Sequence, residues 1–149
     1  LPTHGRNDLL AVGYQNELLL IRGADQIERI EFSSPIRQIV GSALFTRTRL
    51  AVVTDNGTYV LWLQGRSTSQ PIACGQDLTQ PTAGFTLGGH LVLLARGGGE
   101  IYETTGAKLT LSHTFVNFNF SQLAVLQTSE SNEFGVITRA GHVSVHRLG

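Results

Sequence analysis

Four apolar runs recur along this sequence, each ending in a short turn that leads into a second strand-like run. When Asn16, Gly57, Gly98 and Gly141 are taken as the same position in each turn, the spacings are 41, 41 and 43 residues. Glycine and asparagine enter backbone conformations with positive φ more readily than other residues, so we expect a tight hairpin turn at all four positions. A repeat of this size restricts the chain to folds that stack copies of one small motif.

Two further strand-like runs lie between successive hairpins. They cover residues 26–32, 36–45, 71–74, 82–87, 108–113 and 118–127. Together with the hairpins they make fourteen strands, two in the first unit and four in each of the next three. A unit of about 42 residues with four short strands is typical of a β-propeller blade. The sequence therefore predicts an all-β fold of about three and a half four-stranded propeller blades, which is a half-propeller.

Residues 55–62, Asp-Asn-Gly-Thr-Tyr-Val-Leu-Trp, resemble the third-strand signature of WD40-type repeats, in which a turn with glycine precedes an alternating strand that ends in tryptophan. The resemblance covers nearly the whole chain at the level of architecture, and it implies a propeller. It does not extend to the hydrogen-bond network of that family. Leu63 stands where an aspartate would follow the tryptophan, and Glu103 and His146 occupy the tryptophan position in later units.

The alternative fold is a β-trefoil, which also spans about 150 residues with a period near 40 to 50. A trefoil needs three units, whereas four hairpins align here. On the propeller prediction, residues 1–149 form a single β-propeller-like repeat domain that is part of a larger ring or of a longer protein, whereas a trefoil would be a self-closed monomer.

The predicted units are incomplete at both ends, because the first lacks an innermost strand and the last lacks a fourth strand. A propeller closes only when its last blade meets its first. Exposed apolar sheet faces and edges favour association. We therefore expect a protein partner, either a second copy that closes the ring by homodimerisation or a complementary half from another chain.

The composition argues against several classes of partner. Eleven acidic side chains balance eleven basic ones, and only 15% of the residues are charged, so no basic surface is expected to attract nucleic acid. No apolar run approaches the roughly 20 residues that cross a bilayer, and no membrane association is expected. Cys74, the single cysteine, is expected to be a small buried apolar side chain. This cysteine usage favours a cytoplasmic location, with a nuclear one as the alternative.

No catalytic or metal-binding pattern stands out. His142 and His146 belong to an alternating run, in which their rings would lie about 13 Å apart, too far to share one metal ion. In that run we expect Val143 and Val145 to point inward. Residues 97–99 are three glycines that lead into a strand rather than into the helix of a phosphate-binding loop. We therefore predict no metal, no cofactor and no enzymatic activity.

The turns provide the candidate binding face. Gln15, Asp55, Arg96 and Arg139 occupy the same repeat position and should form a ring at one end of the assembly, and exposed arginine is enriched at interfaces. The sequence thus favours a non-catalytic protein–protein interaction scaffold. One alternative is a carbohydrate- or ligand-binding domain of the trefoil-lectin type, which would use an exposed aromatic such as Tyr14. A propeller-type hydrolase or lyase is the second alternative, and it rests on fold analogy alone.

Overall fold

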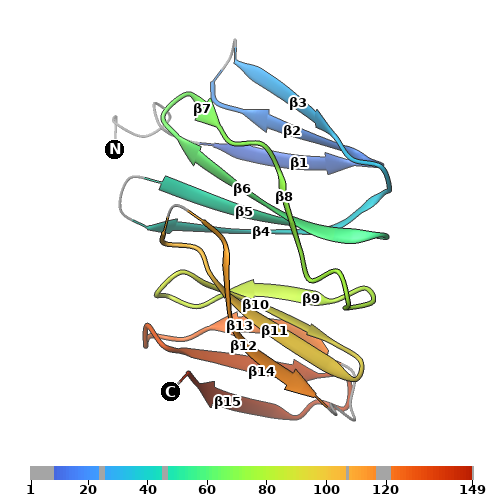
Figure 1. The fold of residues 1–149 in the computed structure, drawn as a ribbon, viewed down its shortest axis with the longest axis vertical. Helices are drawn as coiled ribbons and strands as arrows, with labels where there is room; N and C mark the ends of the chain where they lie inside the picture. The colour runs from blue at the N-terminus through green and yellow to red at the C-terminus, as the bar shows by residue number, and fades with distance from the viewer. Residues whose placement is uncertain (1–8, 24–25, 45–46, 107, 117–121, 149) are drawn as a thin grey trace.

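The part of the chain that the structure describes contains fifteen β-strands and no helix. The structure is a computed structural model, and it describes residues 9–23, 26–44, 47–106, 108–116 and 122–148. Its strands pair antiparallel into four sheets, which lie one above another along the long axis of the molecule (Figure 1). The all-β prediction is confirmed. Within the described ranges, no helix is long and apolar enough to span a bilayer.

The first and fourth sheets form the two ends of the stack and have three strands each (Figure 1). The first sheet consists of β1 (Leu10–Tyr14), β2 (Glu17–Ile21) and β3 (Ile27–Glu31). The fourth sheet consists of β13 (Gln122–Gln127), β14 (Glu133–Thr138) and β15 (Val143–Arg147). In both sheets the strands lie side by side in the order in which they follow along the chain.

The second and third sheets lie between them. The second contains β4 (Ile36–Leu44), β5 (Arg47–Thr54), β6 (Gly57–Gln64), β7 (Ser67–Thr68) and β8 (Ile72–Cys74). The third contains β9 (Thr82–Phe85), β10 (His90–Ala95), β11 (Gly98–Glu103) and β12 (Thr110–Val116). Both β7 and β8 pair with β6. The described part of the chain has one strand more than predicted, because the two-residue strand β7 carries no recognisable sequence pattern.

Three hydrophobic layers, each between neighbouring sheets, form the core. The first layer contains Leu18, Leu20, Phe32, Leu50, Val52, Leu61 and Leu63. The second contains Ala51, Val53, Val60, Trp62, Cys74, Ala83, Phe85, Leu91 and Leu93. The third contains Val92, Leu94, Ile101, Phe134 and Val136. Successive residues of β5 and β10 alternate between two layers, which explains the continuous apolar runs 50–53 and 91–95: both faces of the second and third sheets are covered.

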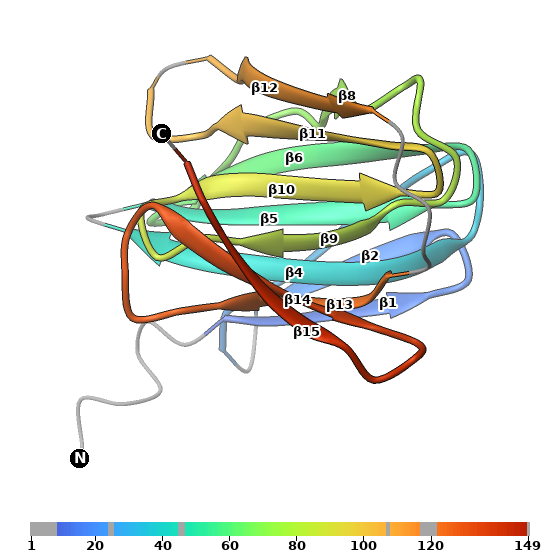
Figure 2. The ribbon, with the colours of Figure 1, turned by 90° about the horizontal axis from the view of Figure 1, so that it is seen from below.

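The first strands of successive sheets are neighbours: β1 contacts β4, β4 contacts β9, and β9 contacts β13. Figure 2, which looks along the stack, shows that the second and third sheets have the same order of strands: β4, β5 and β6 in one and β9, β10 and β11 in the other succeed one another from the same side. At Gly84 the backbone of β9 approaches β13 so closely that an added Cβ would lie 2.6 Å from Cγ1 of Val125. Only glycine, which has no Cβ, permits this approach.

The hairpin turns lie where predicted, but their backbone differs from the prediction. Among these turns, positive φ occurs at Gln15, Gly97 and Gly141. The expectation of positive φ is therefore wrong at Asn16, Gly57 and Gly98. The reason is the pairing register, in which Gly57 pairs with Thr54 and Gly98 with Ala95, so both glycines open the second strand of the hairpin. Asn16, by contrast, is a central residue of the turn between β1 and β2.

The orientation of β15 is opposite to the prediction. Val143 and Val145 were expected to point inward, yet they are 67% and 62% exposed. Instead His146 is on the face of the fourth sheet that is turned toward the third sheet. There its ring stacks on that of Phe134 of β14, with centroids 5.2 Å apart. Because side chains alternate along a strand, this stacking directs both valines to the outer face of the fourth sheet. His142 lies in the turn before β15 rather than on the strand.

Candidate functional site

The four hairpin turns project from the same side of the stack (Figure 1). Hydrogen bonds through the segment before β4 connect the first two turns. Ile36 N–H donates to the carbonyl oxygen of Gln15 (2.6 Å), and Asp55 N–H donates to that of Pro35 (3.0 Å). The predicted ring residues Gln15, Asp55, Arg96 and Arg139 therefore lie in turns at one end of the sheets.

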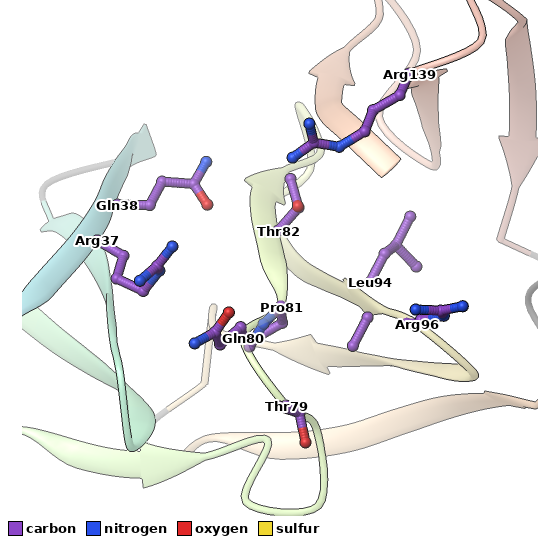
Figure 3. A pocket seen from close by; sticks show the side chains of 10 residues that line it. Arg37, Gln38, Thr79, Gln80, Pro81, Thr82, Leu94, Arg96 and Arg139 are labelled. Carbon is purple, nitrogen blue, oxygen red and sulfur yellow. The ribbon is translucent and has the colours of Figure 1, made fainter. Parts of the chain in front are cut away.

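A pocket of about 610 Å³ opens at this end. Arg96 and Arg139 both line it, together with Arg37, Gln38 and Gln80. Its remaining lining residues are Thr79, Pro81, Thr82, Leu94 and Ala95. Figure 3 shows Arg37 and Gln38 on one side of the pocket and Arg96 and Arg139 on the other, with the segment 80–82 between them. The pocket thus combines side chains from the second, third and fourth sheets.

The charge of the pocket is positive. Three arginines line it, and none of its described lining residues carries a carboxylate. Arg37 donates to Asp55 Oδ1 at 2.9 Å, and both partners of this ion pair are partly exposed. Among the residues that the structure describes, Arg96 and Arg139 have no carboxylate within ion-pairing distance. Two guanidinium groups therefore remain available to an incoming anion.

The side of the pocket between β4 and β9 is held by an amide–backbone hydrogen-bond pair. Gln38 Nε2 donates to the carbonyl oxygen of Ala83 (3.1 Å), and Ala83 N–H donates to Gln38 Oε1 (2.9 Å). Next to this pair, Gln80 adopts a φ of +47° directly before Pro81. A left-handed residue before proline is sterically disfavoured, and such strain persists only where surrounding contacts hold it. The Gln38–Ala83 hydrogen bonds therefore join β4 to β9 at the side of the pocket.

The four predicted binding residues differ in where they lie relative to the pocket. The structure brings Arg96 and Arg139 together at the pocket, and it places Asp55 beside the pocket through Arg37. Gln15 does not line the pocket. Arg37 and Gln38 were missed, although Arg37 stands at the start of a strand that pairs antiparallel with β5. In an antiparallel pair the start of one strand lies beside the end of the other, which places Arg37 at the turn end.

A second polar cluster surrounds Cys74, between the second and third sheets. The Tyr102 hydroxyl donates to Glu100 Oε1 (2.6 Å) and accepts a hydrogen bond from Gly75 N–H (3.0 Å). Burial, followed by the hydrogen bond to Glu100, raises the pKa of Tyr102 above its ordinary value. Burial, with the nearby charge of Glu100, raises the pKa of Cys74 to about 12. Both groups are therefore held in their neutral, weakly nucleophilic forms.

We expect the Cys74 thiol to be unreactive in the native protein. Its side chain is buried in the middle layer of the core, as the sequence predicted, and its raised pKa leaves little thiolate at pH 8. Reaction with Ellman's reagent at pH 8 should be at least about 100-fold slower in buffer than in concentrated guanidinium chloride, because only unfolding exposes the thiol. Equal rates in the two solutions would contradict this burial.

In the described ranges, no group of three or more His, Cys, Asp or Glu side chains is placed to hold a metal ion. Because three arginines line the pocket, the chemistry that it offers is charge recognition by guanidinium groups, which bind carboxylates and phosphates through paired hydrogen bonds. A scan against protein-family models found no match for this chain. A search of curated protein sequences found no match either.

Proposed function

We propose that this chain is a non-catalytic protein–protein interaction scaffold, built from β-propeller blades and closed into a ring with a second copy of itself. The observation that carries the proposal is the exposure of apolar side chains on the outer faces of both end sheets. Each sheet is an antiparallel meander, and its first strand contacts the first strand of the next sheet. This arrangement supports the blade assignment, because the inner strands of successive propeller blades lie side by side around the axis.

The outer face of the first sheet is apolar over about half its length. Cross-strand pairing places Leu10, Ile21 and Ile27 in one row, and Val12, Leu19 and the exposed Arg29 in the next. Leu10 and Ile27 are 58% and 57% exposed. Monomeric proteins rarely leave a contiguous apolar patch of this kind in water. A partner that covers this face would remove the patch from solvent.

The outer face of the fourth sheet is apolar near the turn between β14 and β15, whereas its other end carries the Glu133–Arg147 ion pair. Pairing places Val143 opposite Ile137 and Val145 opposite Gly135, with Leu126 on the same face. Val143, Val145 and Leu126 are all exposed. Two uncovered β-branched side chains on an edge strand favour sheet packing against another chain.

A second copy supplies the required surface at both ends. The three sheet-to-sheet layers within the chain repeat one geometric step, in which one face of a sheet packs on the opposite face of the next. One more step would seat the fourth sheet of one copy on the first sheet of another. Two copies joined head to tail at both ends contain eight sheets, which is within the usual range of closed propellers. The hairpin turns would then form one face that is open to partners.

Val143→Lys combined with Val145→Lys tests this assembly. Placing two ammonium groups in an apolar interface should weaken self-association by at least about 100-fold, as measured by sedimentation velocity over a range of concentrations. Leu111→Lys with Val116→Lys is the matched control, because both residues are exposed on β12 but lie outside the two end faces. Equal association of wild type and both variants would contradict the proposed interface, and so would a wild-type protein that stays monomeric.

A further inference from the structure

We infer that the three-arginine pocket binds an acidic segment of a partner protein, whose carboxylates pair with Arg37, Arg96 and Arg139. This inference deepens the proposed scaffold function, since it names the chemistry that the turn end recognises. The three arginines come from β4, from the turn after β10 and from the turn after β14. They are far apart in the sequence, and only the stacking of three sheets makes them line one pocket.

Charge is the first argument for an anionic ligand. The chain as a whole is neutral, with 11 acidic and 11 basic side chains, yet three basic side chains and no described carboxylate line the pocket. Elsewhere, arginines commonly have partners: Arg22 pairs with Glu28, and Arg147 pairs with Glu133. A locally concentrated positive charge attracts anions and speeds their association.

The size and lining of the pocket favour a peptide over a small ion. A volume of about 610 Å³ lies within the range of sites that enclose ligands much larger than one phosphate. The lining also includes side chains that can donate hydrogen bonds to a peptide backbone and accept them from it, namely those of Thr79, Gln80 and Thr82. A segment with several carboxylates can offer a separate carboxylate to the guanidinium groups on each side of the pocket.

Asp55 provides an internal competitor. Its carboxylate accepts a hydrogen bond from Arg37 at 2.9 Å, which is the interaction that an incoming carboxylate would make. The ion pair is exposed, so it is weak enough to be exchanged. Removing the Asp55 charge should therefore strengthen binding of an acidic peptide, while removing Arg96 and Arg139 should weaken it. Opposite effects from neighbouring residues are a signature that general unfolding cannot produce.

The experiment uses a fluorescein-labelled peptide with a run of glutamates between glycine and serine residues, and its glutamine counterpart. By fluorescence anisotropy at about 50 mM NaCl, the glutamate peptide should bind wild type and the glutamine peptide should not. Arg96→Gln with Arg139→Gln should weaken binding about tenfold or more, and Asp55→Asn should strengthen it about threefold. Arg66→Gln is the control, because Arg66 is exposed after β6 and does not line the pocket. It should change affinity by less than about twofold.

Equal binding of the glutamate peptide to the wild type and the three variants would overturn the inference. Complete displacement of the peptide by inorganic phosphate at a similar concentration would also overturn it, because the pocket would then be a site for small anions. The pocket residues all belong to one chain. Peptide binding by a monomeric protein would therefore support the inference while contradicting the proposed ring. A dimer that binds no acidic peptide would support the ring and contradict the inference.

Discussion

Gly84→Ala is expected to destabilise the protein by about 3 kcal/mol and to lower its melting temperature by about 10 °C. The new Cβ would lie 2.6 Å from Cγ1, 2.7 Å from Cβ and 3.0 Å from the carbonyl oxygen of Val125. The two closest atoms belong to a β-branched side chain and the third to the backbone, so no flexible group can move aside. The strands β9 and β13 must separate, and the hydrophobic layer between the third and fourth sheets must open with them.

Thermal unfolding followed by circular dichroism measures this effect. Gly106→Ala is the matched control, because its Cβ would meet nothing closer than 3.9 Å and its φ is not positive. We expect the control to change stability by no more than about 0.5 kcal/mol. Equal melting temperatures for Gly84→Ala and the wild type would show that β9 and β13 do not approach as described.

Arg49→Ala is expected to cost about 4 kcal/mol, the largest effect of any single charged residue in the described chain. The Arg49 side chain is only 1% exposed. Its Nε donates to the carbonyl oxygen of Thr104 at 2.8 Å, and its Nη1 donates to that of Arg47 at 3.3 Å. Trp62 Nε1 donates to the same Thr104 oxygen at 3.0 Å. Truncation would leave a cavity and disrupt the junction between the second and third sheets.

Arg49→Met separates packing from charge. Methionine fills much of the volume and brings no buried charge, so we expect a loss of only about 1 to 2 kcal/mol. Urea denaturation of the wild type and both variants gives the two free energies of unfolding. If Arg49→Ala and Arg49→Met were equally destabilising, the guanidinium hydrogen bonds rather than the filled volume would account for the whole effect. If neither variant were destabilised, the buried position of Arg49 would be wrong.

Much of the strand content was predictable from the sequence because the inner sheets are covered on both faces. The apolar cores of β5 (residues 50–53) and β10 (residues 91–95) each end in turn residues, so the type and position of these strands followed from composition and spacing. The stretch that became β3 is Ile-Glu-Arg-Ile-Glu, whose isoleucines are three residues apart as on a helix face, yet its assignment as a strand is confirmed. Short elements carry less information. The strand β7 has two residues and was missed.

The direction of side chains was harder to predict at the end of the stack. On β15 the pattern of valines alternating with polar residues normally indicates apolar side chains facing the core. The structure reverses this, because His146 stacks on Phe134 and both valines face outward. A pattern rule assumes that the apolar side chains of a strand face the core of their own chain, and it fails where a sheet leaves them exposed.

The pocket illustrates the same limit. The repeat alignment placed Arg96 and Arg139 at one end of the molecule, since equivalent turns of stacked units share an end. The alignment could not add Gln38 or Gln80, because their positions depend on how the second sheet packs on the third. The hydrogen-bond pair between Gln38 and Ala83 joins residues 45 positions apart, and no local pattern encodes such a contact.

The solution mass of the wild-type protein tests the central claim most directly. Size-exclusion chromatography with multi-angle light scattering, at concentrations from micromolar upward, measures it without any variant. The proposed ring predicts a single species at twice the 16.1 kDa mass of one chain. A monodisperse species of 16.1 kDa at every concentration would contradict it, because the apolar faces of the first and fourth sheets would then be stable in water without a second copy.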